Sequence, residues 1–344
     1  MNKKVVVLGG GRSLSILMRG LKLFPIDLSA VVAVSDDGSS TGRLREEFST
    51  PAVGDVRGVL VSMAETEDII KELLQYRFNT TSDLNGHTVG NLILTAMTKI
   101  TGNLSDAIEQ LGNIFKIKGT ILPFTEEKVT LIAEMSDGTT IEGEHNITEA
   151  HKKIENIYYK EDPIVTPKVI KAVEEADLII FGIGSLYTSI IPNILSDEMR
   201  KAITNSKAKK MYICNAMTQS GETDKFKVSD CIKTLNKYMK QDFLDIVIAA
   251  NTKIPDEIIE KYKTIEAKST ILIDPTEIDE ERVKDLNVEL LQEDLLVISE
   301  QGFVEHDSLK TALLIFNYIM KNSWKREKLA PITSHSLFFY VIIT

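Results

Sequence analysis

Short, continuously apolar runs alternate with segments of helical periodicity along most of this chain. The first apolar run covers Val5–Leu8, a helical stripe that ends at Pro25 follows it, and a second apolar run covers Ala30–Val34. Runs without polar alternation are typical of parallel strands whose two faces are both covered. The pattern therefore predicts an α/β fold, Rossmann-like and doubly wound, with a mainly parallel sheet.

The same rhythm continues through the second half of the chain. Further strands are expected at Leu178–Phe181, Met211–Cys214, Ile246–Ala249, Ile271–Ile273 and Leu295–Ile298. Helical patterns lie between most of them, for example at Ala172–Ala176 and Val228–Met239.

One segment interrupts this alternation. Two β-like runs flank Ser136-Asp137-Gly138, which is a strong hairpin signal. We therefore expect a small inserted β-hairpin subdomain at about 119–165, within a single domain that spans residues 1–320. Residues 321–344 form a C-terminal tail whose end is apolar and β-prone, and no function is assigned to it.

Charge and composition narrow the class of protein. The 344 residues carry 40 Lys and Arg against 50 Asp and Glu, a net charge of −10, which argues against nucleic-acid or anionic-membrane partners. No apolar run approaches the roughly 20 residues of a membrane span. Cys214 and Cys231 show no metal or redox spacing. These observations predict a cytoplasmic protein and leave a homo-oligomer open.

Ligands of open α/β sheets bind beyond the carboxyl ends of the strands, so the loops there are the candidates. The first loop, "LGGGRSLS", leads directly from a strand into a helix, and its glycines let backbone N–H groups approach an anion. It lacks the Gly-Lys-Ser/Thr of a Walker A loop, and Leu14 replaces the third glycine of a dinucleotide fingerprint. A plain glycine-rich turn is the alternative.

The second loop, "VSDDGSSTGR", places two carboxylates side by side. Asp36 and Asp37 could hold Mg²⁺ through oxygen ligands, which makes them candidate metal ligands and candidate catalytic residues. Ser39 adds a hydroxyl, and Arg43 and Arg45 offer planar donors for phosphate. The alternative is an acidic, solvated turn that caps the next helix.

The third and fourth loops each contain residues whose role has two interpretations. In "GDVR", Asp55 and Arg57 share a face of an extended segment, where they either pair with each other or divide ligand hydroxyl and phosphate between them. In "GHTVGNL", His87 stands between glycines just before a helix that we expect to open at Asn91. This histidine is placed for an anion or a proton transfer, and a structural role is the alternative.

The fifth and sixth loops add small and polar groups. Gly184 and Ser185, in "GIGSLYTS", resemble a second phosphate cradle, and Tyr187 either stacks on a base or sugar or belongs to the core. The sixth loop carries Gln219 and Glu222, which suit sugar hydroxyls or a base edge, with a polar linker as the alternative. Together the six loops favour an extended, nucleotide-like phosphorylated ligand.

The ordered motifs resemble those of a known family. "LGGG…LS", "VSDDGSSTGRLR", "GDVR", "GHTVGNL", "G.GSLYTSI.PN" and "CNAMTQSGETD" are similar, in order, to the motifs of the CofD-like superfamily. Within it, the chain looks most like the bacterial gluconeogenesis factor branch (YvcK-type), from about Lys4 to Leu313. The resemblance implies a Rossmann-like fold.

The resemblance also implies two different activities. The founding enzyme, 2-phospho-L-lactate transferase, moves a phospholactyl group from a guanosine diphosphate carrier to a deazaflavin. The YvcK-type branch is instead associated with binding UDP-sugars, notably UDP-N-acetylglucosamine, and with cell shape and wall synthesis on gluconeogenic carbon. No reaction is established for that branch, so catalysis is left open.

The resemblance also assigns residues. It implies that Gly10, Gly11 and Ser15 lie near the nucleotide phosphates and that Asp36 and Asp37 lie at the diphosphate or its metal. With the loop residues above, the candidate ligand-binding set is Gly10, Gly11, Arg12, Ser15, Asp36, Asp37, Ser39, Arg43, Asp55, Arg57, His87, Asn91, Gly184, Ser185, Leu186, Tyr187, Asn215, Thr218, Gln219, Glu222 and Asp224.

The chain departs from the family pattern at four positions. Arg12-Ser13 replaces the usual Thr-Gly, Gly58 replaces the usual asparagine, and Ile183 stands where proline is common. The glycine lost at position 13 removes backbone freedom, whereas Arg12 adds a charged phosphate donor.

Two functions follow as hypotheses. The first is a UDP-sugar-binding regulator without turnover. The second is a transferase of the 2-phospho-L-lactate type, in which Mg²⁺, the one candidate cofactor, would neutralise the diphosphate. A third, an NAD-dependent dehydrogenase, is disfavoured because the glycine fingerprint fails.

Overall fold

The computed structural model describes residues 2–265 and 274–327. Its centre is a seven-stranded sheet in the order β10-β9-β8-β7-β1-β2-β3, and each of these pairings is parallel. The strands are β1 Lys3–Gly9, β2 Ile26–Val32, β3 Thr120–Pro123, β7 Leu178–Phe181, β8 Lys209–Ile213, β9 Ile246–Ala250 and β10 Glu289–Glu293. The predicted doubly wound parallel sheet is confirmed.

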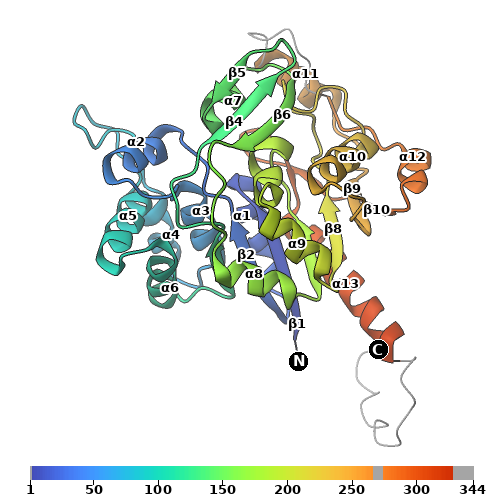
Figure 1. Ribbon diagram of the computed structural model, residues 1–344, viewed down its shortest axis with the longest axis horizontal. Coiled ribbons are helices and arrows are strands. Elements are labelled where there is room, and N and C mark those ends of the chain that lie inside the picture. Colours follow the sequence, from blue (N-terminus) through green and yellow to red (C-terminus); the bar gives the residue numbers. More distant parts are fainter. Residues whose placement is uncertain (1, 266–273, 328–344) are drawn as a thin grey trace, which may run out of the picture.

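The strand order reverses direction at β1. This strand pairs with β2 on one side, where Val5 lies opposite Leu28, and with β7 on the other, where Val5 lies opposite Leu178. The loop after β1 leads to α1 behind the sheet, whereas the chain after β7 leads to α9 in front of it (Figure 1). Such a switch point opens a crevice in which α/β proteins bind ligands.

Helices cover both faces of the sheet, with α8, α9 and α10 in front and α1 behind in Figure 1. Helix α1 packs against α3 and α13 on the rear face. The α-helices are α1 Gly11–Leu21, α2 Ser39–Phe48, α3 Gly54–Met63, α4 Asp68–Gln75, α5 Val89–Thr101, α6 Leu104–Ile114, α7 Glu144–Glu149, α8 Pro167–Glu174, α9 Asp197–Asn205, α10 Val228–Met239, α11 Asp256–Ile265, α12 Glu280–Asp285 and α13 Ser308–Glu327. Two short turns of other helix types, η1 Leu186–Ile190 and η2 Ile191–Ile194, follow β7.

The predicted hairpin forms a separate small sheet, β5-β4-β6, made of β4 Leu131–Met135, β5 Thr140–Glu142 and β6 Ile154–Tyr159. Its tight turn uses Gly138, whose φ of 83° is left-handed and favours glycine. Strand β3 falls inside the expected range of about 119–165 but belongs to the main sheet, so the small sheet begins only at Leu131. The small sheet stands over the carboxyl ends of the central strands (Figure 1).

Other strand predictions had different outcomes. The run expected at Leu295–Ile298 forms β11 Leu296–Ile298, but it pairs antiparallel with β12 Val304–His306 rather than joining the parallel sheet. The strand expected at Ile271–Ile273 lies outside the described residues, as do residues 328–344 of the C-terminal tail.

The core is built from the apolar runs that the sequence displays. Val5, Val7 and Leu8 of β1 are fully buried, and Leu14 and Leu17 of α1 pack onto them in one continuous hydrophobic cluster. Among the described residues, no helix is long and apolar enough to span a bilayer.

Candidate functional site

The two glycine loops meet at the switch point of the sheet. Gly10 follows β1 and Gly184 follows β7, and a Cβ built at Gly184 would lie 3.4 Å from the carbonyl oxygen of Gly10. A Cβ at Gly10 would lie 3.6 Å from the Cβ of Ser189. The two loops, 174 residues apart in the chain, are therefore in direct contact, because β1 and β7 are neighbours in the sheet.

Asp55 closes one side of this junction. Its Oδ2 accepts a hydrogen bond of 2.6 Å from the backbone N–H of Gly11, and a Cβ at Gly10 would lie only 2.8 Å from the same oxygen. Burial, and secondly the charge of Asp36, raise the pKa of Asp55 to about 7. Asp55 thus takes up or releases a proton near neutral pH, directly beside the glycine loop.

The prediction of an extended segment around Asp55 and Arg57 is wrong, because these residues lie in the first turn of α3. The structure also gives them separate partners. Arg57 donates from Nε to Oδ1 of Asn91 over 2.9 Å, and Asn91 donates from Nδ2 to Ser40 over 3.1 Å. These contacts tie α3, α5 and α2 together behind the site.

His87 belongs to the same network. Its Nδ1 lies 3.0 Å from the hydroxyl of Ser40, and its side chain is buried. Burial, and secondly the charge of Arg43, lower the pKa of His87, so the neutral ring is favoured. Helix α5 begins at Val89 with Thr88 as its N-cap, two residues earlier than expected.

The two adjacent aspartates bind backbone groups. Asp36 accepts from the N–H of Gly38 over 2.9 Å, and Asp37 accepts from the N–H of His145 over 2.8 Å, at the first turn of α7. Asp37 therefore attaches the small subdomain to the carboxyl edge of the main sheet.

These contacts bear on the predicted magnesium site. Within residues 2–265 and 274–327, no group of three or more His, Cys, Asp or Glu side chains is placed to hold a metal ion. Asp36 and Asp37 each accept one backbone N–H group with Oδ1 only, so a metal site at this pair stays a prediction.

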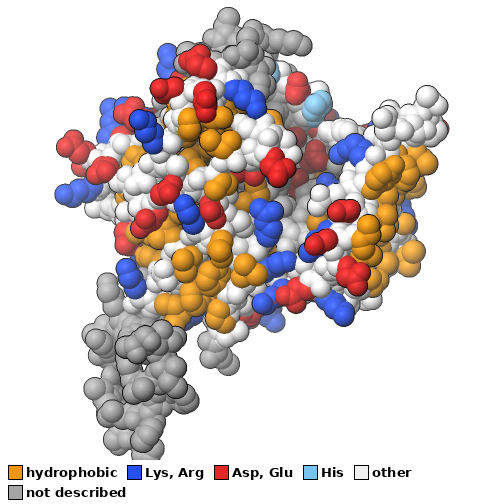
Figure 2. All heavy atoms as spheres, turned by 180° about the vertical axis from the view of Figure 1, so that it is seen from behind, with side chains coloured by type: hydrophobic (Ala, Val, Ile, Leu, Met, Phe, Trp, Pro, Cys, Tyr) orange, Lys and Arg blue, Asp and Glu red, His pale blue; other side chains and the backbone are white. Residues whose placement is uncertain are grey.

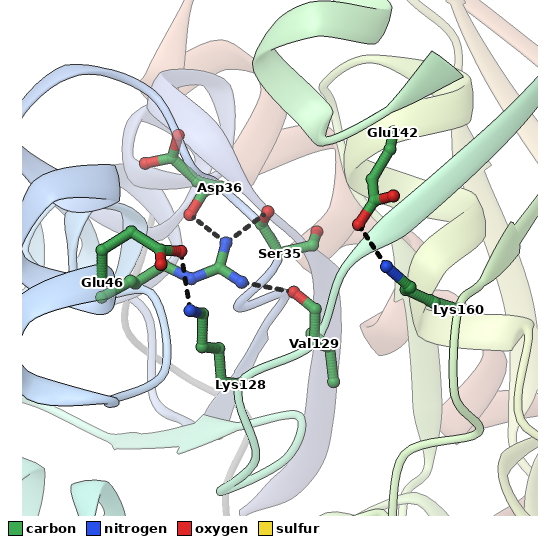
Figure 3. Close-up of polar contacts among 8 residues, drawn as sticks. Ser35, Asp36, Glu46, Lys128, Val129, Glu142 and Lys160 are labelled. Carbon is green, nitrogen blue, oxygen red and sulfur yellow. Dashed lines mark hydrogen bonds and ion pairs between the residues drawn. The ribbon is translucent and has the colours of Figure 1, made fainter. Parts of the chain in front are cut away.

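The arginines expected to bind phosphate are held by backbone carbonyls instead. Arg45 is 3% exposed and donates to the carbonyls of Ser35, Asp36 and Val129. Figure 3 shows these three carbonyls converging on one guanidinium. Arg43 donates to carbonyls in the loop before α5. Arg45 thus shapes the acidic loop by holding its backbone.

The loop after β7 is held by residues from the sixth predicted motif. Asn215 accepts from the N–H of Gly184 over 3.2 Å and donates to its carbonyl over 2.7 Å and to Gln219 over 3.1 Å. The hydroxyl of Ser185 donates to Glu222, which also accepts from the N–H of Tyr187 over 3.4 Å. Burial raises the pKa of Glu222 to about 7.

Several candidates lie in the walls of the site. Tyr187 is 5% exposed, and its ring packs edge-on against that of Tyr238 at 6.3 Å, which favours the core alternative. Other candidates with structural contacts are Ser39 at the start of α2, Leu186 in the core, Thr218 bonded to Asp274, and Asp224 bonded to Gly221.

Sequence reasoning missed Glu144. It comes from α7 of the small subdomain, bonds Thr188, and has its pKa raised by burial and by the charge of Asp36. It therefore faces both the acidic loop and the loop after β7. No motif points to it, because only folding brings the inserted segment over the sheet.

A cavity of about 340 Å³, here called the glycine-loop cavity, opens between these loops. Its lining residues are Arg12, Ser13, Ile16, Ile183, Gly184, Ser185, Asn215, Ala216, Met217, Gln219, Tyr262, Phe303, Val304, Glu305 and His306. The rings of Tyr262 and Phe303 lie 6.4 Å apart, and the Tyr262 hydroxyl accepts from the N–H of Val304. Sequence reasoning missed both rings, since no motif surrounds them.

A second cavity, of about 820 Å³, adjoins the first. The candidates Gly11, Arg12, Ser15, Asp55 and Arg57 line it. Nine of the 21 predicted ligand residues thus line one or both of these neighbouring cavities, with Arg12 on both. The other twelve, among them Gly10, Asp37 and His87, line neither of the two.

Comparison with known proteins identifies the family of this chain. Residues 5–296 match the family described as "2-phospho-L-lactate transferase CofD". Among curated proteins, the chain is 40% identical over 317 residues to the gluconeogenesis factor of Bacillus subtilis, covering 92% of this chain and 98% of that protein. It is 39% identical to the gluconeogenesis factor of Halalkalibacterium halodurans, covering 90% of this chain and 94% of that protein.

Solved structures agree with this result. A crystal structure of a Bacillus halodurans protein superposes with a TM-score of 0.87 at 37% identity, covering 92% of this chain and 100% of that one. A second crystal structure from that organism, titled as a member of the upf0052 family, gives a TM-score of 0.86 at 37% identity over 91% and 99% of the two chains.

Proposed function

Because this chain belongs to the CofD family, we propose that it binds a nucleotide sugar, UDP-N-acetylglucosamine, in the glycine-loop cavity and acts as a regulator without turnover. The observation that carries this proposal is the composition of that one cavity. Its lining brings together the first turn of α1 with Arg12, the aromatic rings of Tyr262 and Phe303, and the amide side chains of Asn215 and Gln219.

Each part of the ligand finds matching chemistry. The first-turn N–H groups of α1 and the guanidinium of Arg12 suit the diphosphate. Tyr262 and Phe303 offer ring faces and edges to a base. Gln219 presents an amide to sugar hydroxyls. The volume of about 340 Å³ falls within the usual range for small-molecule sites.

The regulatory part of the proposal rests on the relatives. Proteins named gluconeogenesis factor match this chain over nearly their whole length. A protein that senses a wall precursor such as UDP-N-acetylglucosamine could adjust cell shape and wall synthesis when cells grow on gluconeogenic carbon.

Calorimetry tests the binding step. UDP-N-acetylglucosamine should bind the wild type with one site per chain, and Tyr262→Ala should weaken binding at least about tenfold because a stacking surface is lost. Tyr158→Ala is the matched control, since Tyr158 is an exposed tyrosine of the small sheet. Absence of binding to folded wild type would refute the proposal, as would equal weakening in both variants.

The transferase remains a second candidate, and one observation favours it. Asp55 and Glu222 flank the two glycine loops with pKa values raised to about 7, as suits groups that move protons at neutral pH. In this reaction the acceptor hydroxyl oxygen forms a new P–O bond, the diphosphate P–O bond breaks, and nucleoside monophosphate leaves. The hydroxyl proton passes to a base.

A single-turnover assay separates the two candidates. Wild-type protein is mixed with a lactyl-diphosphoguanosine donor and a deazaflavin acceptor, with and without Mg²⁺, and guanosine monophosphate is measured. A regulator without turnover forms none, whereas the transferase forms one equivalent per chain.

A further inference from the structure

The second cavity differs in character from the glycine-loop cavity. It lies on the rear of the sheet between α1, α3 and α4, and we call it the basic cavity. Its lining residues are Gly11, Arg12, Ser15, Ile16, Arg19, Lys22, Gly54, Asp55, Arg57, Gly58, Val61, Ser62, Lys71, Gln75, Arg77, Gln301 and Glu305. Six of these are basic and two are acidic.

Such a concentration of positive charge is unusual for this protein, whose net charge is −10. Figure 2 views the rear face, where several Lys and Arg side chains border a hollow. Converging charges of one sign raise the free energy of the empty cavity, and a bound anion would relieve that repulsion.

Two pairs of basic groups oppose each other there. The pKa of Lys22 is lowered by burial and then by the charge of Lys71, and the pKa of Arg57 is lowered by burial and then by the charge of Arg77. The lowered pKa values mean that the two positive charges in each pair repel each other. Lys71 has one acidic partner, Asp68, at 2.9 Å.

The inner wall adds donors that carry no side-chain charge. Gly11 and Gly54 are the first residues of α1 and α3, so two helix N-termini reach the cavity. First-turn N–H groups lack intrahelical acceptors and favour anions, and the N–H of Gly11 already donates to the carboxylate of Asp55 over 2.6 Å. The cavity therefore combines six basic side chains with the first residues of two helices.

We propose that the basic cavity binds a small anion that carries two or more phosphate or carboxylate groups. This cavity adjoins the glycine-loop cavity proposed for the nucleotide sugar, and Arg12, Ile16 and Glu305 line both. The two sites share the ion pair between Arg12 and Glu305, whose atoms lie 2.6 Å apart. A single phosphate would engage only part of a set of donors spread over three helices, whereas a bisphosphate or tricarboxylate would reach several of them.

This inference goes beyond the proposed function and is tested separately. The probe is inorganic pyrophosphate, measured by calorimetry at low and at physiological salt, with inorganic phosphate as the singly phosphorylated comparison. The test variant carries Lys22→Gln with Lys71→Gln. The control carries Lys168→Gln with Lys171→Gln, which removes the same charge from α8 on the opposite face of the sheet.

We expect pyrophosphate to bind with one site per chain and more tightly than phosphate. The test variant should weaken pyrophosphate binding by about tenfold or more, since two charged donors are lost, and the control by less than about twofold. Binding of UDP-N-acetylglucosamine should be the same in both variants.

Three results would overturn the proposal. They are failure of folded wild type to bind pyrophosphate, equal weakening in test and control variants, and unchanged affinity in the test variant, which would show that Lys22 and Lys71 do not bind the probe. If the test variant does not fold, Arg19→Gln replaces it, because Arg19 is exposed on α1 and lines only this cavity of the two.

Discussion

Glu222 offers a direct test of the electrostatics inferred for the site. Glu222 is 5% exposed, and burial raises its pKa from the ordinary 4.5 to about 7. Between pH 4.5 and pH 7 the folded protein holds a proton on Glu222 that the unfolded chain has released. The free energy of unfolding therefore falls as the pH rises through this window, and this decrease is complete above about pH 7. At 1.36 kcal/mol for each pKa unit, the loss amounts to about 3 kcal/mol.

Glu222→Gln removes the titrating group and keeps an oxygen to accept from Ser185. The free energy of unfolding of the variant should therefore equal that of the wild type at pH 4.5 and exceed it by about 3 kcal/mol at pH 8. Urea unfolding, followed by circular dichroism at several pH values, measures this difference. The shifted pKa of Asp55 is common to both proteins and cancels.

Glu142→Gln is the matched control. Glu142 is an exposed residue of the small sheet that pairs with Lys160 at 2.7 Å, so its replacement should change stability by less than about 1 kcal/mol at any of these pH values. A difference between Glu222→Gln and wild type that stays constant from pH 4.5 to 8 would refute the reasoning, because it would show that the buried carboxyl does not titrate in this range.

Three further predictions concern the loops. Gly10→Ala should destabilise the fold by about 1–3 kcal/mol in urea unfolding and abolish nucleotide-sugar binding in calorimetry, because the new Cβ would lie 2.8 Å from Oδ2 of Asp55. Unchanged binding would contradict this steric contact. Asp37→Ala should cost about 1 kcal/mol and speed hydrogen exchange at His145, since that N–H loses its acceptor; unaltered exchange there would exclude the attachment. Lowering the pH from 8 to 6 should protonate Asp55 and tighten binding of a diphosphate, as followed by calorimetry; weaker binding at pH 6 would contradict this sign.

Much of the fold could be predicted because the signals are local. A continuous apolar run such as Val5–Leu8 has to be covered on both faces, and the helix pattern at Val228–Met239 reproduces α10 residue for residue. The glycine loops were predictable for the same reason, since a strand, a glycine turn and a helix adjoin in the chain. The expectation for Asp55 and Arg57 failed because a spacing of two residues does not distinguish a strand from the first turn of a helix.

The sequence by itself determined the parallel sheet, the inserted hairpin and the loops that follow the strands, because apolar periodicity and turn residues act over a few neighbouring positions. Only the tertiary structure decided which loops meet. The pairing of β1 with β7 joins Gly10 to Gly184, the small subdomain brings Glu144 over them, and α1 and α4 bring Lys22 and Lys71 to one cavity. Such contacts depend on strand order and helix packing, which no single stretch of sequence encodes.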